Sequence, residues 1–410
     1  MTDKLSEDMP KEVLDKINEQ IDIVKRNSLD FVSEEELRER LKENRPLRVK
    51  LGVDPSRPDL HLGHAVVLRK LREFQDLGHQ VVLIIGDFTA RIGDPSGKSK
   101  TRPMLSMEEV KENAISYQEQ AYIILDRERT EVRFNGEWLD KMNFEDVVRL
   151  SANYTVARML ERDDFNNRYN SNEPISVAEF LYPLAQAYDS VAVKSDIELG
   201  GTDQLFNLLV GRKIQEAHGI KPQMVLTMPI IEGTDGTQKM SKSLGNYIAF
   251  NDIPKDIFGK VMSIPDELMI KYFRLLTDLP EEEISAMENS MKDGNVNPRD
   301  YKMKLGKLMV ELVYGVEEAE KALEEFVRVF QQKKAPTEMP ELNVEQDKIK
   351  LLDLLSKTHL QSRSEAKRVV TQGGVSINEV KKADPFEEIE ISNGDILRIG
   401  KKKFYRLIVD

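Results

Sequence analysis

The strongest constraint on the fold lies in residues 47–85, where two strand patterns flank a helix pattern. Apolar residues alternate with others over residues 47–53, as expected for a β-strand. Residues 81–85 are apolar throughout, as a parallel strand buried on both faces requires. Between them, a turn at 54–59 leads into leucines and a phenylalanine at helical spacing. This strand–helix–strand unit predicts an α/β fold with a Rossmann-like parallel sheet, a common frame for nucleotide binding.

The composition indicates folded domains and excludes several other classes of protein. The chain has 410 residues, of which 40% are hydrophobic and 32% charged, so it is neither disordered nor collagen-like. No apolar run approaches the ~20 residues of a membrane span, and the N-terminus lacks the apolar segment of a signal peptide. The chain has no cysteine, which excludes disulfides, thiolate metal sites and a cysteine nucleophile. We therefore expect a cytoplasmic protein.

Pattern and charge divide the chain into five predicted parts. They are an N-terminal helical segment (1–45), a Rossmann-like catalytic domain (46–250), an α-helical domain (251–335), a linker (336–347) and a small α+β domain (348–410). The last part holds 13 Lys and Arg against 9 Asp and Glu, whereas the whole chain has a net charge of −12. A basic domain on an acidic body indicates a polyanionic partner, although a solvated charged surface explains the same composition.

Two of the five histidines, His61 and His64, stand where the first strand–helix turn becomes a helix. The spacing places both rings on one face of the first helical turn, where free amide groups already attract phosphate. Gly63 between them leaves room for a flat group to approach the backbone. Three interpretations remain open at this point: phosphate donors, a helix cap without a ligand, or a pair of metal ligands.

A second motif, KMSKS at residues 239–243, follows a glycine-containing loop. Lys239 and Lys242 on such a loop can close over a polyphosphate and neutralise the charge that develops on a leaving pyrophosphate. A solvated lysine loop is the simpler alternative.

A third group of polar residues falls on one predicted helix face. Tyr182, Gln186 and Asp189 are spaced at i, i+4 and i+7, and they are polar where a core-facing stripe would be apolar. The string GGTDQ at 200–204 and Asp94 at an earlier turn add further polar groups. Taken singly, each of these is also compatible with a surface face or a simple turn.

The HLGH string at 61–64 and KMSKS at 239–243, in this order on an α/β pattern, resemble the paired signatures of class I aminoacyl-tRNA synthetases. With the third group, residues from about 30 to 410 resemble the tyrosyl-tRNA synthetases of the bacterial type. The resemblance implies a tyrosine–tRNA ligase. Such an enzyme first converts tyrosine and ATP to tyrosyl-adenylate and pyrophosphate. It then transfers the tyrosyl group to the 3′ end of its tRNA and releases AMP.

The resemblance also implies roles for single residues around the amino acid. Asp189 binds the phenol hydroxyl, and Gln204 lies near the carboxylate. The α-amino group is held by Tyr182, Gln186 and Asp94. Many members of the family place a tyrosine two residues before Gly52 as a second partner of the phenol. Here that position is Lys50, so Asp189 carries more of the discrimination.

Around ATP, the resemblance implies a nucleotide pocket lined by Gly52 and Asp54, with Asp203 near the ribose. The groups expected around the phosphates are His61, His64, Lys98, Arg102, Lys239 and Lys242. Magnesium is expected to arrive with ATP, without a dedicated metal site on the protein and without a tightly bound cofactor.

The C-terminal residues 360–378 read as a basic helix, a Gly-Gly turn and a strand. They resemble the small RNA-binding domain shared with a ribosomal protein of the small subunit. Arg363, Lys367 and Arg368 fall near one helical face, suited to phosphate contacts. The family resemblance further implies an anticodon-binding role for the α-helical domain and a homodimer.

Three other functions remain possible on the sequence. A tryptophanyl-tRNA synthetase shares the fold and both signatures, a catalytically inactive relative would only bind RNA, and a simple nucleotidyltransferase also uses an HxGH string. The polar helix face disfavours the first, the intact histidines and lysines disfavour the second, and the basic C-terminal domain disfavours the third.

Overall fold

The computed structural model describes residues 10–55, 58–95, 106–294, 296–332, 334–360, 362–400 and 403–409. The chain forms two compact units, Met1–Val316 and Glu317–Asp410. The division falls inside the predicted helical part, residues 251–335. Within the described residues, no helix is both long and apolar enough to cross a membrane.

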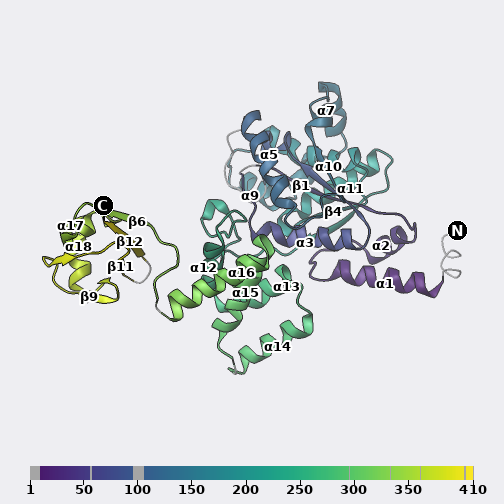
Figure 1. The fold of residues 1–410 in the computed structure, drawn as a ribbon. Coiled ribbons are helices and arrows are strands. Elements are labelled where there is room, and N and C mark those ends of the chain that lie inside the picture. Colours follow the sequence, from purple (N-terminus) through teal and green to yellow (C-terminus); the bar gives the residue numbers. More distant parts are fainter. Residues whose placement is uncertain are drawn as a thin grey trace. The chain divides into compact units, whose positions relative to one another are not determined.

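The first unit is built around a parallel sheet of five strands in the order β3-β2-β1-β4-β5. Two of its neighbouring strands, β1 and β4, are labelled in Figure 1. The strands are β1 (Arg48–Val53), β2 (Gln80–Ile85), β3 (Thr130–Phe134), β4 (Ile197–Gly201) and β5 (Met224–Met228). The chain runs outward from β1 to β3 and then returns to place β4 on the other side of β1. In sheets of this kind, ligands bind beyond the carboxyl ends of the strands at the point where the order reverses, here between β1 and β4.

Helices pack around this sheet and extend beyond it. The helices as far as β5 are α1 (Lys11–Lys25), α2 (Glu34–Leu41), α3 (Leu62–Asp76), α4 (Thr89–Ile92), α5 (Met107–Ala121), α6 (Gly136–Leu139), α7 (Phe144–Ser151), α8 (Val156–Met159), α9 (Asp163–Asn170), α10 (Val177–Ala192), η1 (Thr202–Gln204) and α11 (Leu205–Ala217). After β5 follow η2 (Lys242–Leu244), α12 (Pro254–Ser263), η3 (Asp266–Leu268), α13 (Met269–Leu276), α14 (Glu281–Lys292) and α15 (Pro298–Tyr314). The last of these form a helical group in Figure 1, in which α15 packs on α12 and α13.

The strand–helix–strand prediction is confirmed, because β1, α3 and β2 occupy the predicted segments within one residue at each end. Residues 81–85 of β2 are all buried, as their continuous apolar pattern requires. The α2 helix begins after Ser33, whose hydroxyl accepts a hydrogen bond from the Glu36 amide at 3.2 Å. Such a cap satisfies one of the amide groups that a helix start leaves free.

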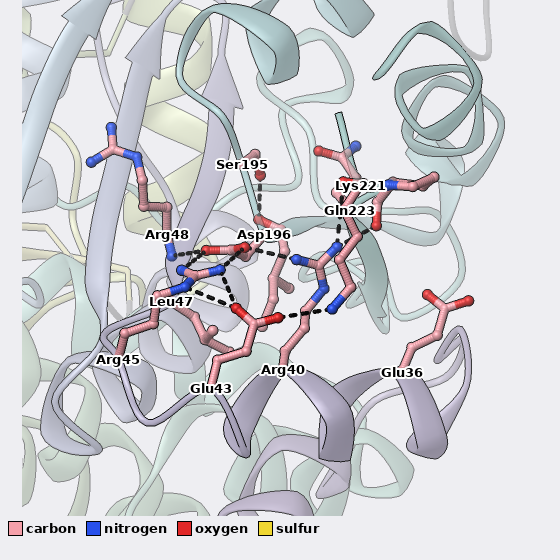
Figure 2. A network of polar contacts seen from close by, with 12 residues as sticks. Glu36, Arg40, Glu43, Arg45, Leu47, Arg48, Ser195, Asp196, Lys221 and Gln223 are labelled. Carbon is pink, nitrogen blue, oxygen red and sulfur yellow. Dashed lines mark hydrogen bonds and ion pairs between the residues drawn. The ribbon is translucent and has the colours of Figure 1, made fainter. Parts of the chain in front are cut away.

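A buried polar network fixes the α2 segment to the amino end of β4 (Figure 2). Arg40, with only 2% of its surface exposed, donates to the Asp196 carboxylate at 2.7 Å and to the Pro222 carbonyl. Arg45 donates to both oxygens of Asp196 at 2.7 Å, and the Arg48 amide adds a third donor at 2.9 Å. The Asp196 carboxylate is thus fully satisfied, as a buried charge must be.

The second unit begins within a longer helix, and its later described residues form a five-stranded sheet, a two-stranded ribbon and two short helices. The sheet has the order β6-β12-β11-β8-β9, and β10 pairs with β7. Following α16 (Val316–Phe326) and η4 (Val327–Gln331), the elements are β6 (Glu341–Val344), β7 (Lys348–Lys350), α17 (Leu351–Ser356), α18 (Arg363–Thr371), β8 (Val375–Ile377), β9 (Val380–Lys382), β10 (Glu388–Glu390), β11 (Ile396–Ile399) and β12 (Lys403–Val409). This unit has its own apolar core, drawn from residues 344–407.

The β6 strand lies inside the segment that we expected to be a linker. It pairs in parallel with β12, so residues 341–344 belong to the C-terminal sheet. The strand has only four residues and follows a proline-rich sequence, so the sequence pattern did not indicate it.

Candidate active site

A cavity of about 950 Å³ opens at the carboxyl ends of β1, β2 and β4. The predicted site residues of the catalytic domain that the structure describes all line it: Gly52, Asp54, His61, His64, Asp94, Tyr182, Gln186, Asp189, Asp203, Gln204, Lys239 and Lys242. The other two predicted residues, Lys98 and Arg102, lie outside the described residues. Side chains from segments far apart in the sequence therefore meet around one space.

The two histidines cap the start of α3 and keep one donor each. His61 Nδ1 accepts from the Gly63 amide at 3.1 Å, and His64 Nδ1 accepts from the His61 amide at 3.2 Å. Burial lowers the pKa of His64 to about 4 and that of His61 well below its usual value. Both rings are therefore neutral near pH 7 and carry their proton on Nε2. The capping role and the donor role are compatible, since a ligand can accept from both Nε2–H groups.

The lysines of the KMSKS loop are both paired with carboxylates of other segments. Lys239 Nζ lies 3.2 Å from Asp203, and Lys242 Nζ lies 3.7 Å from Asp59 and 5.8 Å from the centre of the Tyr117 ring. The Lys242 side chain is only 9% exposed, whereas that of Lys239 is 48% exposed. The loop thus brings the buried charge of Lys242 and the accessible charge of Lys239 to the same cavity.

Asn246 anchors this loop, although the sequence patterns did not single it out. Its side chain is buried, and its Oδ1 accepts from the Ser241 amide at 2.8 Å. Its Nδ2 donates to the Lys239 carbonyl at 3.1 Å and to Asp235 at 2.8 Å. These bonds fix the backbone on both sides of Met240, from which the two lysines extend.

The polar face of α10 lies against the other end of the cavity. The Tyr182 hydroxyl donates to Asp54 at 2.8 Å, and Gln204 Nε2 donates to Asp94 at 2.9 Å. The i, i+4, i+7 pattern of the sequence therefore marks a cavity face, and the alternative of a solvent-facing surface is excluded for Tyr182 and Asp189, which are both buried.

Asp189 is the most deeply buried carboxylate in this group, at 2% exposure. Burial raises its pKa to about 7, and the nearby Lys50 ammonium limits the rise. Trp138 Nε1 donates to one of its oxygens at 2.8 Å, and Asn135 Nδ2 donates to the other at 3.3 Å. Sequence reasoning missed both donors. The one sequence feature that could have indicated Asn135 is its position, because it directly follows β3 at the carboxyl edge of the sheet.

The predicted RNA-binding side chains lie on α18 of the second unit. Arg363, Lys367 and Arg368 are all exposed. Arg363 forms an ion pair with Asp353, and the Lys367 ammonium lies 5.2 Å from the centre of the exposed Phe386 ring. The helix thus presents three accessible cations beside an exposed aromatic ring.

Comparison with known proteins assigns both units to described families. Residues 42–331 match the model of the class I tRNA synthetases for tryptophan and tyrosine, and residues 331–407 match the C-terminal domain model of tyrosine–tRNA ligases. The chain is 64% identical to a tyrosine–tRNA ligase of Thermotoga maritima over 95% of this chain and 97% of that protein. The chain belongs to the tyrosine–tRNA ligase family. A relative from Carboxydothermus hydrogenoformans is 51% identical over 97% of this chain and 99% of that protein.

Solved structures of lower identity show the shared fold of this family. A tyrosyl-tRNA synthetase from Archaeoglobus fulgidus, solved with L-tyrosine, is 24% identical and superposes with a TM-score of 0.62 over 75% of this chain and 99% of that one. A tryptophanyl-tRNA synthetase from Plasmodium falciparum, 15% identical, superposes with a TM-score of 0.59 over 77% of this chain and 89% of that one. The fold alone therefore does not separate the two amino acids. The family resemblance and the fold class predicted from the motifs are confirmed.

Proposed function

We propose that this chain ligates tyrosine to its tRNA in two steps. In the first, a tyrosine carboxylate oxygen attacks the α-phosphorus of ATP, and the bond to the bridging oxygen breaks to release pyrophosphate. In the second, the terminal ribose hydroxyl of the tRNA attacks the acyl carbonyl, and the bond to the phosphate breaks to release AMP. The observation that carries this proposal is that the two histidines, the loop lysines and the α10 face all line one cavity.

On the phosphate side, catalysis rests on positioning and charge stabilisation. His61 and His64 donate through Nε2–H to oxygens of the α-phosphate as negative charge builds up on them. Lys239 and Lys242 exchange their carboxylate partners for the departing pyrophosphate, and Lys98 and Arg102 join them. Gly52 and Asp54 line the nucleotide pocket, with Asp203 toward the ribose.

On the amino-acid side, the buried groups match the polar groups of tyrosine. Asp189 accepts a hydrogen bond from the phenol hydroxyl, because its two other partners leave a lone pair on each oxygen. The α-amino group lies among Tyr182, Gln186 and Asp94, and the carboxylate lies near Gln204. Phenylalanine would leave the buried Asp189 carboxylate without its partner, which is unfavourable. Tryptophan would place its larger indole ring in the space that the phenol ring of tyrosine occupies.

Magnesium enters with ATP in this proposal. Mg²⁺ commonly binds through substrate phosphates and retained waters. The described residues contain no group of three His, Asp or Glu side chains arranged to hold a metal ion.

The remaining assignments concern partners and domains. In this proposal the α-helical part, residues 251–335, contacts the anticodon, and α18 contacts RNA phosphates through Arg363, Lys367 and Arg368. A homodimer is supported by exposed apolar side chains on α7, where Phe144 is 84% exposed and Val148 is 52% exposed. The site of action is the cytoplasm, where the tRNA substrate is charged.

The decisive experiment is amino-acid-dependent exchange between pyrophosphate and ATP, run separately with tyrosine, tryptophan and phenylalanine. Exchange with tyrosine alone is the expected result. Exchange with tryptophan would overturn the assignment of the α10 face. No exchange with any of the three, in a protein that is folded and binds tRNA, would favour a catalytically inactive RNA-binding relative.

A further inference from the structure

A buried ion pair lies directly behind the α10 face of the cavity. Lys50 on β1 and Glu198 on β4 are register neighbours on adjacent parallel strands, and they are 0% and 1% exposed. Lys50 Nζ lies 2.8 Å from Glu198 Oε1. The pair stands at the point where the strand order reverses, which is also where the cavity opens.

The Lys50 ammonium holds α10 on both sides of Asp189. It donates to the Gln186 carbonyl at 3.1 Å and to the Ser190 hydroxyl at 2.7 Å. Two donor contacts, one three residues before Asp189 and one directly after it, restrict how this helical turn can rotate. The positive charge also favours the ionised form of the neighbouring Asp189 carboxylate and so lowers its pKa.

The Glu198 carboxylate fixes the orientation of the Gln186 amide. Gln186 Nε2 donates to Glu198 Oε1 at 3.3 Å, so the amide oxygen is turned away from the carboxylate. That oxygen is buried and has no hydrogen-bond partner among the described residues, while Gln186 itself lines the cavity. A buried acceptor of this kind requires a donor, and the ammonium group of an amino acid supplies one.

Glu198 is itself held from the far side. Its Oε2 accepts from the Ser190 hydroxyl at 3.1 Å and from the Gln223 amide. One Glu198 oxygen is therefore held by Lys50 and Gln186, and the other by Ser190 and Gln223. Buried charges of this kind cost desolvation energy, and apolar residues of similar volume often stabilise a fold as well or better. Stability alone does not account for the pair at this place.

We propose that Lys50 and Glu198 form a positioning pair that determines recognition of the amino-acid substrate, by holding Gln186 toward its ammonium group and Asp189 toward its phenol. The inference rests on the proposed function and deepens it. Neither residue lines the cavity, so both act through residues of α10. The pair therefore affects the binding of the amino acid and has no effect on the binding of ATP.

The test compares Lys50→Met with Arg40→Met. Both substitutions remove a buried cation that is paired with a buried carboxylate, but Arg40 lies in the network at the amino edge of the sheet (Figure 2). We expect Lys50→Met to raise the KM for tyrosine in pyrophosphate exchange by about tenfold or more, with the KM for ATP within about twofold of the unaltered protein. The preference for tyrosine over phenylalanine should fall in parallel. Arg40→Met should lower the thermal midpoint and leave both KM values unchanged.

Glu198→Gln provides a second variant that preserves shape and keeps a side-chain acceptor for Gln186. We expect the same selective rise in the KM for tyrosine, smaller than in Lys50→Met, because only the charge is lost. A KM for tyrosine within about twofold of the unaltered value in this variant, or equal rises in both KM values, would overturn the inference. The inference also fails if Lys50→Met and Arg40→Met behave alike. Absence of tyrosine-dependent exchange in the unaltered protein would instead overturn the proposed function, and the inference with it.

Discussion

Tyrosine binding should depend on pH through the single carboxylate of Asp189. Its pKa is raised to about 7 in the free protein because the group is buried, so the protonated form dominates below that value. About one tenth of the molecules are ionised at pH 6 and about nine tenths at pH 8 for a group of this pKa. If only the ionised form accepts the phenol hydroxyl, the apparent dissociation constant is about ten times larger at pH 6 than at pH 8.

The assay can use the only tryptophan of the chain, because Trp138 donates directly to Asp189. Its fluorescence reports the titration of the free carboxylate and, in the same sample, the binding of tyrosine. The cavity histidines do not interfere, because burial places the pKa of His64 at about 4 and that of His61 well below its usual value. Asp189→Asn is the matched control and should show weak binding with no step between pH 6 and 8. A flat profile in the unaltered protein, or the same step in Asp189→Asn, would refute the assignment of Asp189 to the phenol.

Three further predictions address the loop, the second unit and acid stability. Lys242→Ala should slow pyrophosphate exchange by about 10²–10³-fold, the usual loss for one charge-stabilising donor, while the affinity for tyrosine stays unchanged. Equal losses in exchange rate and tyrosine affinity would contradict a role of Lys242 in closing the loop over the phosphates. Combined replacement of Arg363, Lys367 and Arg368 by alanine should preserve pyrophosphate exchange and weaken tRNA charging, with a shallower salt dependence than the unaltered protein. If exchange fails as well, α18 has a structural role. The free energy of unfolding should fall as pH drops below about 6.5, because burial lowers the pKa of both His64 and His79 to about 4 and the unfolded chain takes up protons first. Each histidine with a pKa of about 4 contributes a loss of about 2 kcal/mol at pH 5. The drop in the free energy of unfolding between pH 8 and pH 5, measured by urea denaturation, should therefore be about 2 kcal/mol smaller in His79→Gln than in the unaltered protein, and an equal drop in both would contradict the reasoning.

Local patterns predicted the parts of the fold that depend on neighbouring residues. The period of the apolar residues identified β1, α3 and β2, and the Ser33 pattern identified the start of α2. The order of the strands did not follow in the same way. Pairing of β1 with β4 joins segments about 150 residues apart, and no local period specifies such a contact.

The candidate site was predictable where chemistry and spacing coincide in one short string, as at 61–64 and 239–243. The partners of those residues were not. Asp59, Asn135 and Trp138 became recognisable only once the fold brought them next to Lys242 and Asp189. Lys50 left one clue, because a charged residue on a strand of a sheet covered on both faces must find a buried partner. The sequence could not identify Glu198 as that partner.

The buried ion pairs at the amino edge of the sheet and behind the cavity have different roles. At the amino edge, the Asp196 carboxylate receives donors from Arg40, Arg45 and the Arg48 amide, and so it is fully satisfied within the protein. At the carboxyl edge, the Gln186 amide oxygen is buried without a partner among the described residues. The satisfied Asp196 carboxylate contributes to the free energy of unfolding, whereas the Gln186 oxygen belongs to a residue that lines the cavity, where a ligand supplies the missing donor. Substitutions at the amino edge should therefore change the thermal midpoint, and substitutions behind the cavity should change the KM for tyrosine. The location of a buried charge, at the amino edge of the sheet or behind the cavity, then decides which of the two quantities it controls.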